Sequence, residues 1–149
     1  MTRGLAALGL AAVLAAAPAR AEWASGSTSE VPLEGGGGSW LVRATLNGTL
    51  NGVFLLDTGA TYCVLSPTTA GRLGVAPTGL ETSMQTANGP VRVPVVQVRT
   101  FDVGGNRARD VRAVVHAGVP PPLDGILGLS YLNNFSYSID PKRRVLKLH

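Results

Sequence analysis

The sequence contains little of the two residue types that most often build metal centres and nucleophilic dyads: it has one cysteine, Cys63, and two histidines, His116 and His149. A lone cysteine cannot form an internal disulfide, so folding depends on the hydrophobic core alone. No group of His, Cys and Asp residues has the spacing of zinc ligands. One histidine lies in an apolar run and the other at the terminus, so a Cys/His enzyme is only a minor alternative. We therefore expect no metal and no cofactor, and we expect Cys63 and His116 to be core residues.

Charged residues are also scarce, at 15% of the chain, whereas glycine (19 residues) and proline (10 residues) are abundant. This balance favours short strands joined by turns over long helices. A chain of 149 residues that is 45% hydrophobic can bury one core but has no room for a second domain. We therefore expect a single all-β domain.

Basic residues form only short clusters, and these have no interleaved aromatic residues. Arg107, Arg109 and Arg112 make one cluster, and residues 142–144 make another. Nucleic-acid surfaces combine positive charge with aromatic side chains that stack on bases. Charge on solvated strand edges, where it discourages aggregation, explains these clusters better. We therefore expect no nucleic-acid partner.

The first 21 residues are typical of a secretory signal peptide. Arg3 supplies a positive charge, residues 5–17 form an apolar run, and residues 19–21 form a small-x-small cleavage site. The apolar run is shorter than the ~20 residues that span a bilayer, which argues against a membrane anchor. An Ala-rich structural helix is the other alternative. We predict an exported, periplasmic protein that contacts a membrane only if this segment is retained.

The rest of the sequence divides into a tether and a folded domain. Residues 22–38 are rich in Ser, Thr and Gly and end in four glycines, so we expect them to be flexible. Residues 39–149 carry the pattern of the folded domain, with turn dipeptides at Asn47-Gly48 and Asn51-Gly52. Ser66-Pro67 predicts a short helix that stops near residues 71–74. The predicted strands are Trp40–Leu46, Val53–Leu56, Thr61–Leu65, Leu80–Thr86, Val91–Val98, Val111–His116, Leu123–Leu127, Tyr137–Ile139 and Arg144–Leu148, with a further helical turn over Ser130–Asn134.

Asp57 is the most informative residue, because its carboxylate follows the apolar run Phe54-Leu55-Leu56. A charge at the end of a buried strand needs hydrogen-bond donors, a partner or a changed protonation state, so it is a mild functional signal. Thr58 adds a hydroxyl, and Gly59 permits close approach of the backbone. An Asp-Thr-Gly tripeptide by itself also fits an ordinary strand exit.

The surrounding sequence favours function, because three landmarks occur in order. They are residues 57–60 (Asp-Thr-Gly-Ala), residues 86–89 (Thr-Ala-Asn-Gly) at the tip of a predicted hairpin, and residues 126–128 (Ile-Leu-Gly). Together they resemble the retropepsin-like aspartic proteases, and specifically the single-lobe, exported bacterial type. The resemblance spans about residues 40–148 and implies a single-lobe acid protease barrel with one or two short helices.

The resemblance implies an aspartic endopeptidase that hydrolyses protein or peptide substrates with two carboxyls around one water. The chain has one Asp-Thr-Gly, so the second carboxyl would come from another copy, in a homodimer in which Asp57 faces Asp57. Two like charges ~4 Å apart cost roughly 4 kcal/mol at an effective dielectric near ~20, so one carboxyl keeps its proton. The ionised Asp57 would act as general base while its protonated twin donates to the carbonyl oxygen.

The resemblance also implies roles for the residues around Asp57. Thr58, Gly59 and Ala60 would support the active-site loop, with Thr58 bonding across the dimer and Gly59 positioning the substrate. The substrate pocket and the flap that closes over it would be formed by Leu55, Ala60, Val64, Ala87, Asn88, Gly89, Pro90, Leu123 and Ile126. Asp124 lies where the family has no catalytic carboxyl, so we expect it to have a structural or pocket-edge role.

One departure from the retroviral pattern leaves a second function open. Retroviral members carry an acid where this chain has Thr61 and an arginine where it has Leu129, and that pair ties the loop to the helix. Without the tie, the dimer must be stabilised elsewhere, and the strand over residues 144–148 is one candidate. If the chain stays monomeric, the alternative is a non-catalytic module that binds extended peptides in the same cleft.

Overall fold

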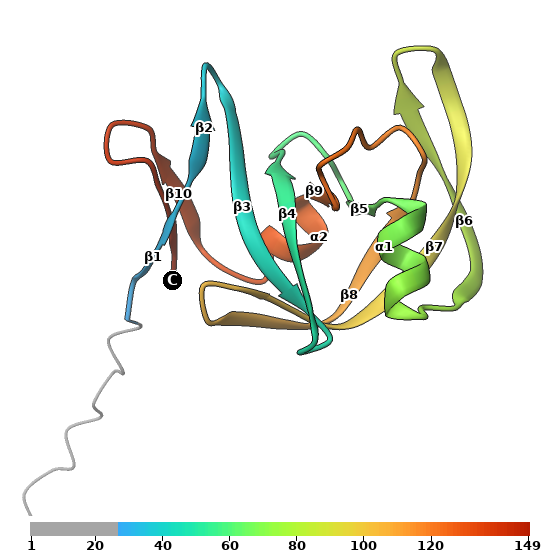
Figure 1. Cartoon of the computed structure of the whole chain (residues 1–149), viewed down its shortest axis with the longest axis horizontal. Coiled ribbons are helices and arrows are strands. Elements are labelled where there is room, and N and C mark those ends of the chain that lie inside the picture. The colour runs from blue at the N-terminus through green and yellow to red at the C-terminus, as the bar shows by residue number, and fades with distance from the viewer. Residues whose placement is uncertain (1–26) are drawn as a thin grey trace, which may run out of the picture.

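The computed structural model describes residues 27–149, which form the fold shown in Figure 1. The predicted signal peptide, residues 1–21, and the first part of the predicted tether lie outside the described residues. Within residues 27–149, eleven strands and two short helices confirm the all-β prediction. Neither helix of this part of the chain is long and apolar enough to cross a membrane.

Eight strands form the main sheet, in the order β2-β3-β4-β9-β5-β8-β7-β6. A further antiparallel pairing of β3 with β7, at Thr45↔Asp102 and Leu46↔Phe101, curls the sheet into a partly closed barrel. The bounds of these strands are β2 Glu34–Gly36, β3 Ser39–Leu46, β4 Leu50–Leu56, β5 Cys63–Leu65, β6 Pro77–Thr86, β7 Gly89–Val103, β8 Asn106–Val115 and β9 Gly125–Leu127.

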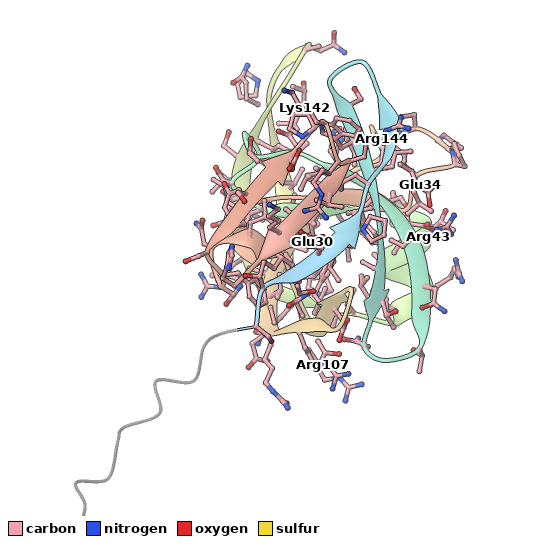
Figure 2. All side chains as sticks on the ribbon, turned by 90° about the vertical axis from the view of Figure 1, so that its left-hand side faces the viewer. Glu30, Glu34, Arg43, Arg107, Lys142 and Arg144 are labelled. Carbon is pink, nitrogen blue, oxygen red and sulfur yellow. The ribbon has the colours of Figure 1, made fainter. Side chains whose placement is uncertain are left out.

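The remaining strands, β1 (Ser29–Pro32), β10 (Tyr137–Asp140) and β11 (Val145–Leu148), form a small sheet in the order β1-β11-β10. Both edges of β11 are therefore occupied within the chain. The candidate dimer strand over residues 144–148 has no free edge to offer, and any strand pairing with a second copy through this sheet would use β1 or β10. Charged side chains, including Glu30 and Arg144, lie on this face of the molecule (Figure 2).

The small sheet also corrects the predicted tether. From Ser29 onward the segment is folded, because Val31 and Leu33 are each only 5% exposed and pack in the core. The Leu33 N–H donates to the Arg144 carbonyl at 2.8 Å, which joins this segment to the C-terminal hairpin. The glycines form the tight turn between β2 and β3, where Gly37 and Gly38 have φ of 65° and 90°. The prediction of a flexible tether is wrong for this part.

Local turn and capping signals are largely confirmed. Helix α1 (Pro67–Leu73) begins after Ser66, whose Oγ accepts from the Thr69 N–H at 3.1 Å, and it ends at Gly74 with φ 63°. Asn47-Gly48 forms the predicted turn between β3 and β4. Asn51-Gly52 is not a turn, because both residues lie within β4 and pair with β3. The second helix, α2, spans Leu129–Leu132.

The core consists of two clusters of buried apolar side chains. The larger is centred on a chain of aromatic rings, in which Phe54, Phe101, Tyr131 and Phe135 follow one another at centroid distances of 5.2, 5.3 and 5.2 Å. The smaller, called here the pocket cluster, consists of Val64, Val93, Val95, Val114 and Val119. The larger cluster stabilises the barrel, whereas the pocket cluster underlies the site described next.

Candidate active site

Asp57 lies in a tight loop directly after β4. Its N–H donates to the Leu127 carbonyl at 3.0 Å, and its carbonyl accepts from the Ala60 N–H at 3.3 Å. One carboxylate oxygen, Oδ1, accepts from the Gly59 N–H at 2.9 Å. Within residues 27–149, the other oxygen, Oδ2, has no hydrogen-bond partner, and the side chain is half-buried. The fold therefore holds Asp57 in place and leaves one oxygen available to a ligand.

The loop rests on the end of β9 and the start of α2, and two glycines permit close approach here, Gly128 to the loop and Gly125 to β5. A Cβ on Gly128 would lie 2.5 Å from the Tyr62 carbonyl oxygen and 2.7 Å from that of Ala60. A Cβ on Gly125 would collide with the Val64 carbonyl. The apolar-apolar-Gly landmark thus lies directly beneath the Asp57 loop, as the resemblance implies.

A backbone hydrogen bond holds the loop against α2 without the acid–arginine tie. Thr61 is exposed, and Leu129 packs on the larger core cluster instead of carrying a charge. The Leu129 N–H donates to the Ala60 carbonyl at 2.8 Å. This bond, together with the Asp57–Leu127 bond, fixes the loop from within the chain.

A pocket of about 660 Å³ opens beside Asp57, between the loop, the β6–β7 hairpin and the end of β8. Of the predicted site residues, the structure brings five to this pocket: Asp57, Gly59, Ala60, Val64 and Ile126. The pocket cluster forms its floor, with Val64, Val114 and Val119 among the lining residues. The pocket is therefore apolar below, with one carboxylate at its edge.

The other predicted site residues lie near the pocket but do not line it. Leu123 packs against the pocket cluster from below. Leu55 is half-buried in β4, where it pairs with Leu41 and Ile126. Thr58 is exposed in the loop, and within residues 27–149 its hydroxyl makes no hydrogen bond.

The predicted flap is the β6–β7 hairpin, which extends beyond the barrel (Figure 1). Its tip contains Ala87, Asn88 and Gly89, and the Thr86 hydroxyl closes the turn by donating to the Gly89 carbonyl at 2.7 Å. The tip does not line the pocket. The residues of the hairpin that do are Thr82, Ser83, Met84, Gln85 and Thr86.

Several lining residues were not predicted from the sequence. They include Tyr62, Val114 and Val119. The sequence around each of them does not show whether the side chain points into the pocket or into the core, so no local signal identifies them. His116 is half-buried and lines the pocket directly after β8, so the prediction that it is a core residue is wrong. The sequence does carry a signal for His116, the same one as for Asp57, because each is a polar residue directly after an apolar strand.

Asp124 has a structural role. Its Oδ2 accepts from the Val53 N–H at 2.8 Å, and its Oδ1 accepts from the Thr69 hydroxyl at 3.4 Å. The Thr69 hydroxyl in turn accepts from the Ser66 hydroxyl at 2.9 Å. Asp124 therefore joins β4 to the start of α1, and it does not line the pocket beside Asp57.

Cys63 lies in the core, as predicted. Its side chain is fully buried, and its Sγ accepts from the Gly128 N–H at 3.4 Å. Burial raises the pKa of the Cys63 thiol, and this disfavours the reactive thiolate. Cys63 therefore packs β5 against β9 and does not act as a nucleophile.

A larger hollow of about 810 Å³ lies on another face, between β1–β2 and β3–β4, but its acids are engaged. Asp102 accepts from the Gly105 N–H at 2.8 Å and from Arg107 Nε at 3.4 Å. Glu34 pairs with Arg43 at 2.9 Å, and both are labelled in Figure 2. The smaller pocket, which holds a carboxylate oxygen without a partner in the described chain, is the better candidate for a reactive site.

Comparisons with known proteins identify the family and the fold. A family model for aspartyl proteases matches residues 42–131, a segment that includes the Asp57 loop, the flap and β9. No curated protein matches the sequence. The fold is similar to that of a retropepsin-like aspartic protease from Rickettsia conorii, with a TM-score of 0.63, 23% sequence identity, and coverage of 82% of this chain and 91% of the other. The chain belongs to the aspartyl protease family and has the retropepsin-like fold.

Proposed function

We propose that the protein is an aspartic endopeptidase that hydrolyses peptide bonds as a homodimer, with Asp57 of each copy forming one catalytic pair. The observation that carries this proposal is the composition of the pocket. Among the described residues, Asp57 is its only carboxylate, and one Asp57 oxygen has no partner. A single carboxyl cannot act as base toward water and as acid toward the carbonyl oxygen at the same time. A second copy supplies the missing group.

In the proposed mechanism, the two Asp57 carboxyls share one proton. Two ionised carboxylates ~4 Å apart would repel by roughly 4 kcal/mol at an effective dielectric near ~20, so one stays protonated. The ionised Asp57 removes a proton from water as the water attacks the peptide carbonyl carbon. The protonated Asp57 donates to the carbonyl oxygen. We propose that Thr58 bonds the partner loop, and the exposure of this residue at the loop supports this.

The substrate is an extended peptide that lies between the pocket floor and the flap. The β6–β7 hairpin offers backbone groups for strand-like pairing, and side chains of the substrate enter the pocket over the pocket cluster. No residue of β6 is fully buried, so this strand is packed loosely against the rest of the chain. Such packing fits a hairpin that opens to admit a peptide and closes over it. We also propose that the protein is exported to the periplasm, on the basis of its first 21 residues.

The test compares Asp57→Asn with Asp110→Asn in cleavage of an unfolded protein substrate. Asp57→Asn removes the carboxylate but keeps the shape, and we expect activity to fall by about 10²–10⁴-fold, as for loss of a general base. Asp110 is an exposed residue with φ 53°, a conformation that Asn also tolerates, so Asp110→Asn is the matched control. Undiminished cleavage by purified Asp57→Asn protein would refute the proposal. Peptide binding without cleavage by the native protein would indicate the binding module instead.

A further inference from the structure

His116 lies in the same pocket as Asp57, and the proposed mechanism gives it no role. Its N–H donates to the Leu65 carbonyl at 3.1 Å, so its backbone continues the pairing of β8 with β5. The imidazole is half-buried and lines the pocket together with Val114 and Val119. A polar ring thus stands next to the valines of the pocket floor, in a pocket whose hairpin side also carries hydroxyl and amide side chains.

The ring is held in one tautomer by the backbone. The Gly118 N–H donates to His116 Nδ1 at 2.9 Å, so Nδ1 acts as an acceptor and the proton of the neutral ring lies on Nε2. Glycine at position 118 permits this close approach, because a Cβ there would lie 2.5 Å from Cε1 and 2.7 Å from Nδ1 and would displace the ring. The loop therefore positions His116 as a hydrogen-bond donor through Nε2.

This donor is open to a ligand. Within residues 27–149, Nε2 has no hydrogen-bond partner, and no fully buried side-chain nitrogen or oxygen of that range lacks one. Nε2 therefore reaches solvent, on a side chain that lines the pocket. A substrate group that displaces this water must offer an acceptor, because an N–H that loses its water without gaining a new partner weakens binding of the substrate.

The charges around the pocket decide which acceptor fits. Among the described lining residues, Asp57 is the only charged side chain, and there is no lysine or arginine. A substrate carboxylate would bring a second negative charge near Asp57 without a cation to balance it. A side-chain amide offers the same acceptor oxygen without charge, on an alkyl stem that can pack against Val114 and Val119.

We propose that His116 is a specificity-determining residue that selects glutamine or asparagine side chains in the substrate by donating from Nε2 to the amide oxygen. This inference rests on the proposed function, because it names the substrate class of that same pocket. In a homodimer each copy contributes one such pocket. The preference should therefore occur at equivalent positions on both sides of the cleaved bond.

The test uses peptides that carry Gln, Met or Glu at each position around the cleaved bond, since Met has a similar shape but no amide. Wild-type protein should cleave the Gln peptide about tenfold better in kcat/KM than the Met peptide, which is the size of one neutral hydrogen bond. Glu should be no better than Met. His116→Leu should abolish the Gln-to-Met ratio, and His116→Gln, whose amide nitrogen can reach the position of Nε2, should restore part of it.

Binding to the Asp57→Asn variant separates this inference from the proposed catalysis. That variant should bind the Gln peptide about tenfold more tightly than the Met peptide even though it does not cleave either. Absence of a Gln-to-Met difference in both readouts, a preference for Glu, or an unchanged ratio in His116→Leu would overturn the role of His116. If the wild-type protein cleaves neither peptide but still prefers the Gln peptide in binding, the catalytic proposal alone is overturned.

Discussion

Two aspartates, Asp57 and Asp124, lie beside apolar strands that pair with each other, and their surroundings differ in one respect. Both oxygens of Asp124 accept hydrogen bonds from the chain, from the Val53 N–H and the Thr69 hydroxyl. Asp57 accepts only one, from Gly59. Both acids line a pocket, Asp57 the one beside its loop and Asp124 the larger hollow. The two acids follow similar sequence logic, so hydrogen-bond saturation is what separates the acid that supports the fold from the acid available for chemistry.

The largest expected effect comes from disrupting the Asp124 corner through its neighbour. Gly125→Ala places a methyl group against the Val64 carbonyl and the Phe54 ring. Neither backbone nor packed ring can move freely, so the free energy of unfolding should fall by about 3 kcal/mol or more. Urea denaturation followed by fluorescence measures this. Gly71→Ala, at a helical site with nothing within 4 Å, is the matched control and should be neutral or stabilising.

The next effect compares the two acids directly by truncating each one. Asp124→Ala leaves the part-buried Val53 N–H without an acceptor, so the free energy of unfolding should fall by about 1–3 kcal/mol. Asp57→Ala leaves only the exposed Gly59 N–H, which water can satisfy, and should change it by less than about 0.5 kcal/mol. Equal losses of stability in the two variants would show that the number of hydrogen bonds accepted by each carboxylate does not determine how much it stabilises the fold.

These two acids also show how far sequence reasoning reaches. Asp57 and its loop were predictable, because a carboxylate after a buried strand and the three ordered landmarks are all local features of the sequence. Helix α1 was predictable for the same reason, since Ser66, Pro67 and Gly74 lie at its ends. The hydrogen-bond partners of Asp124 were not predictable, because Val53 and Thr69 are brought to it only by folding.

The errors have the same origin. The polar residues and glycines around Val31 and Leu33 favour a tether, yet both side chains are buried because the segment pairs with the C-terminal hairpin, more than 110 residues away. His116 was assigned to the core because its own segment is apolar, and only the approach of β5, the flap and the Asp57 loop makes it a pocket residue. Such contacts depend on topology, which a single sequence does not display.

A smaller effect is expected from the hydroxyl relay that links Asp124 to α1. Ser66→Ala removes the side-chain cap of the helix and the donor to the Thr69 hydroxyl. The free energy of unfolding should fall by about 1 kcal/mol, as for other helix caps. Thr68→Ala, at an exposed position of the same helix, serves as the control in the same denaturation experiment. A loss in the control as large as in Ser66→Ala would contradict the capping role.

The smallest effect concerns a third acid, Glu30, whose two oxygens are both paired but lie at the surface. Its hydrogen bond to Arg143, with Nη1 at 2.6 Å and Nη2 at 2.8 Å, lowers the pKa of Glu30 below the ordinary value of 4.5. A lowered pKa stabilises the fold above the unfolded-state pKa, and this contribution is lost as the pH falls through the folded-state pKa. Glu30→Gln should therefore be slightly less stable than wild type at pH 7, and the difference should disappear at acid pH, below the folded-state pKa of Glu30, where this carboxyl is protonated in both the folded and the unfolded wild type.

Denaturation at pH 7 and at acid pH tests whether hydrogen bonds to both carboxylate oxygens stabilise the fold when the acid itself is exposed. Because Glu30 is exposed, the difference at pH 7 should be the smallest of the series. A loss in Glu30→Gln as large as that in Asp124→Ala would show that the partial burial of Asp124 is not what makes its hydrogen bonds stabilising.

The most direct test of the central claim, that two copies share one site, is to mix the wild-type protein with the Asp57→Asn variant. The mixing is done at a concentration where sedimentation shows dimers, and cleavage is measured per wild-type chain. If each site needs Asp57 from both copies, a ninefold excess of the variant should lower activity per wild-type chain to about one tenth, because most wild-type chains then pair with an inactive copy. Activity per wild-type chain that stays constant at every ratio would contradict the shared site.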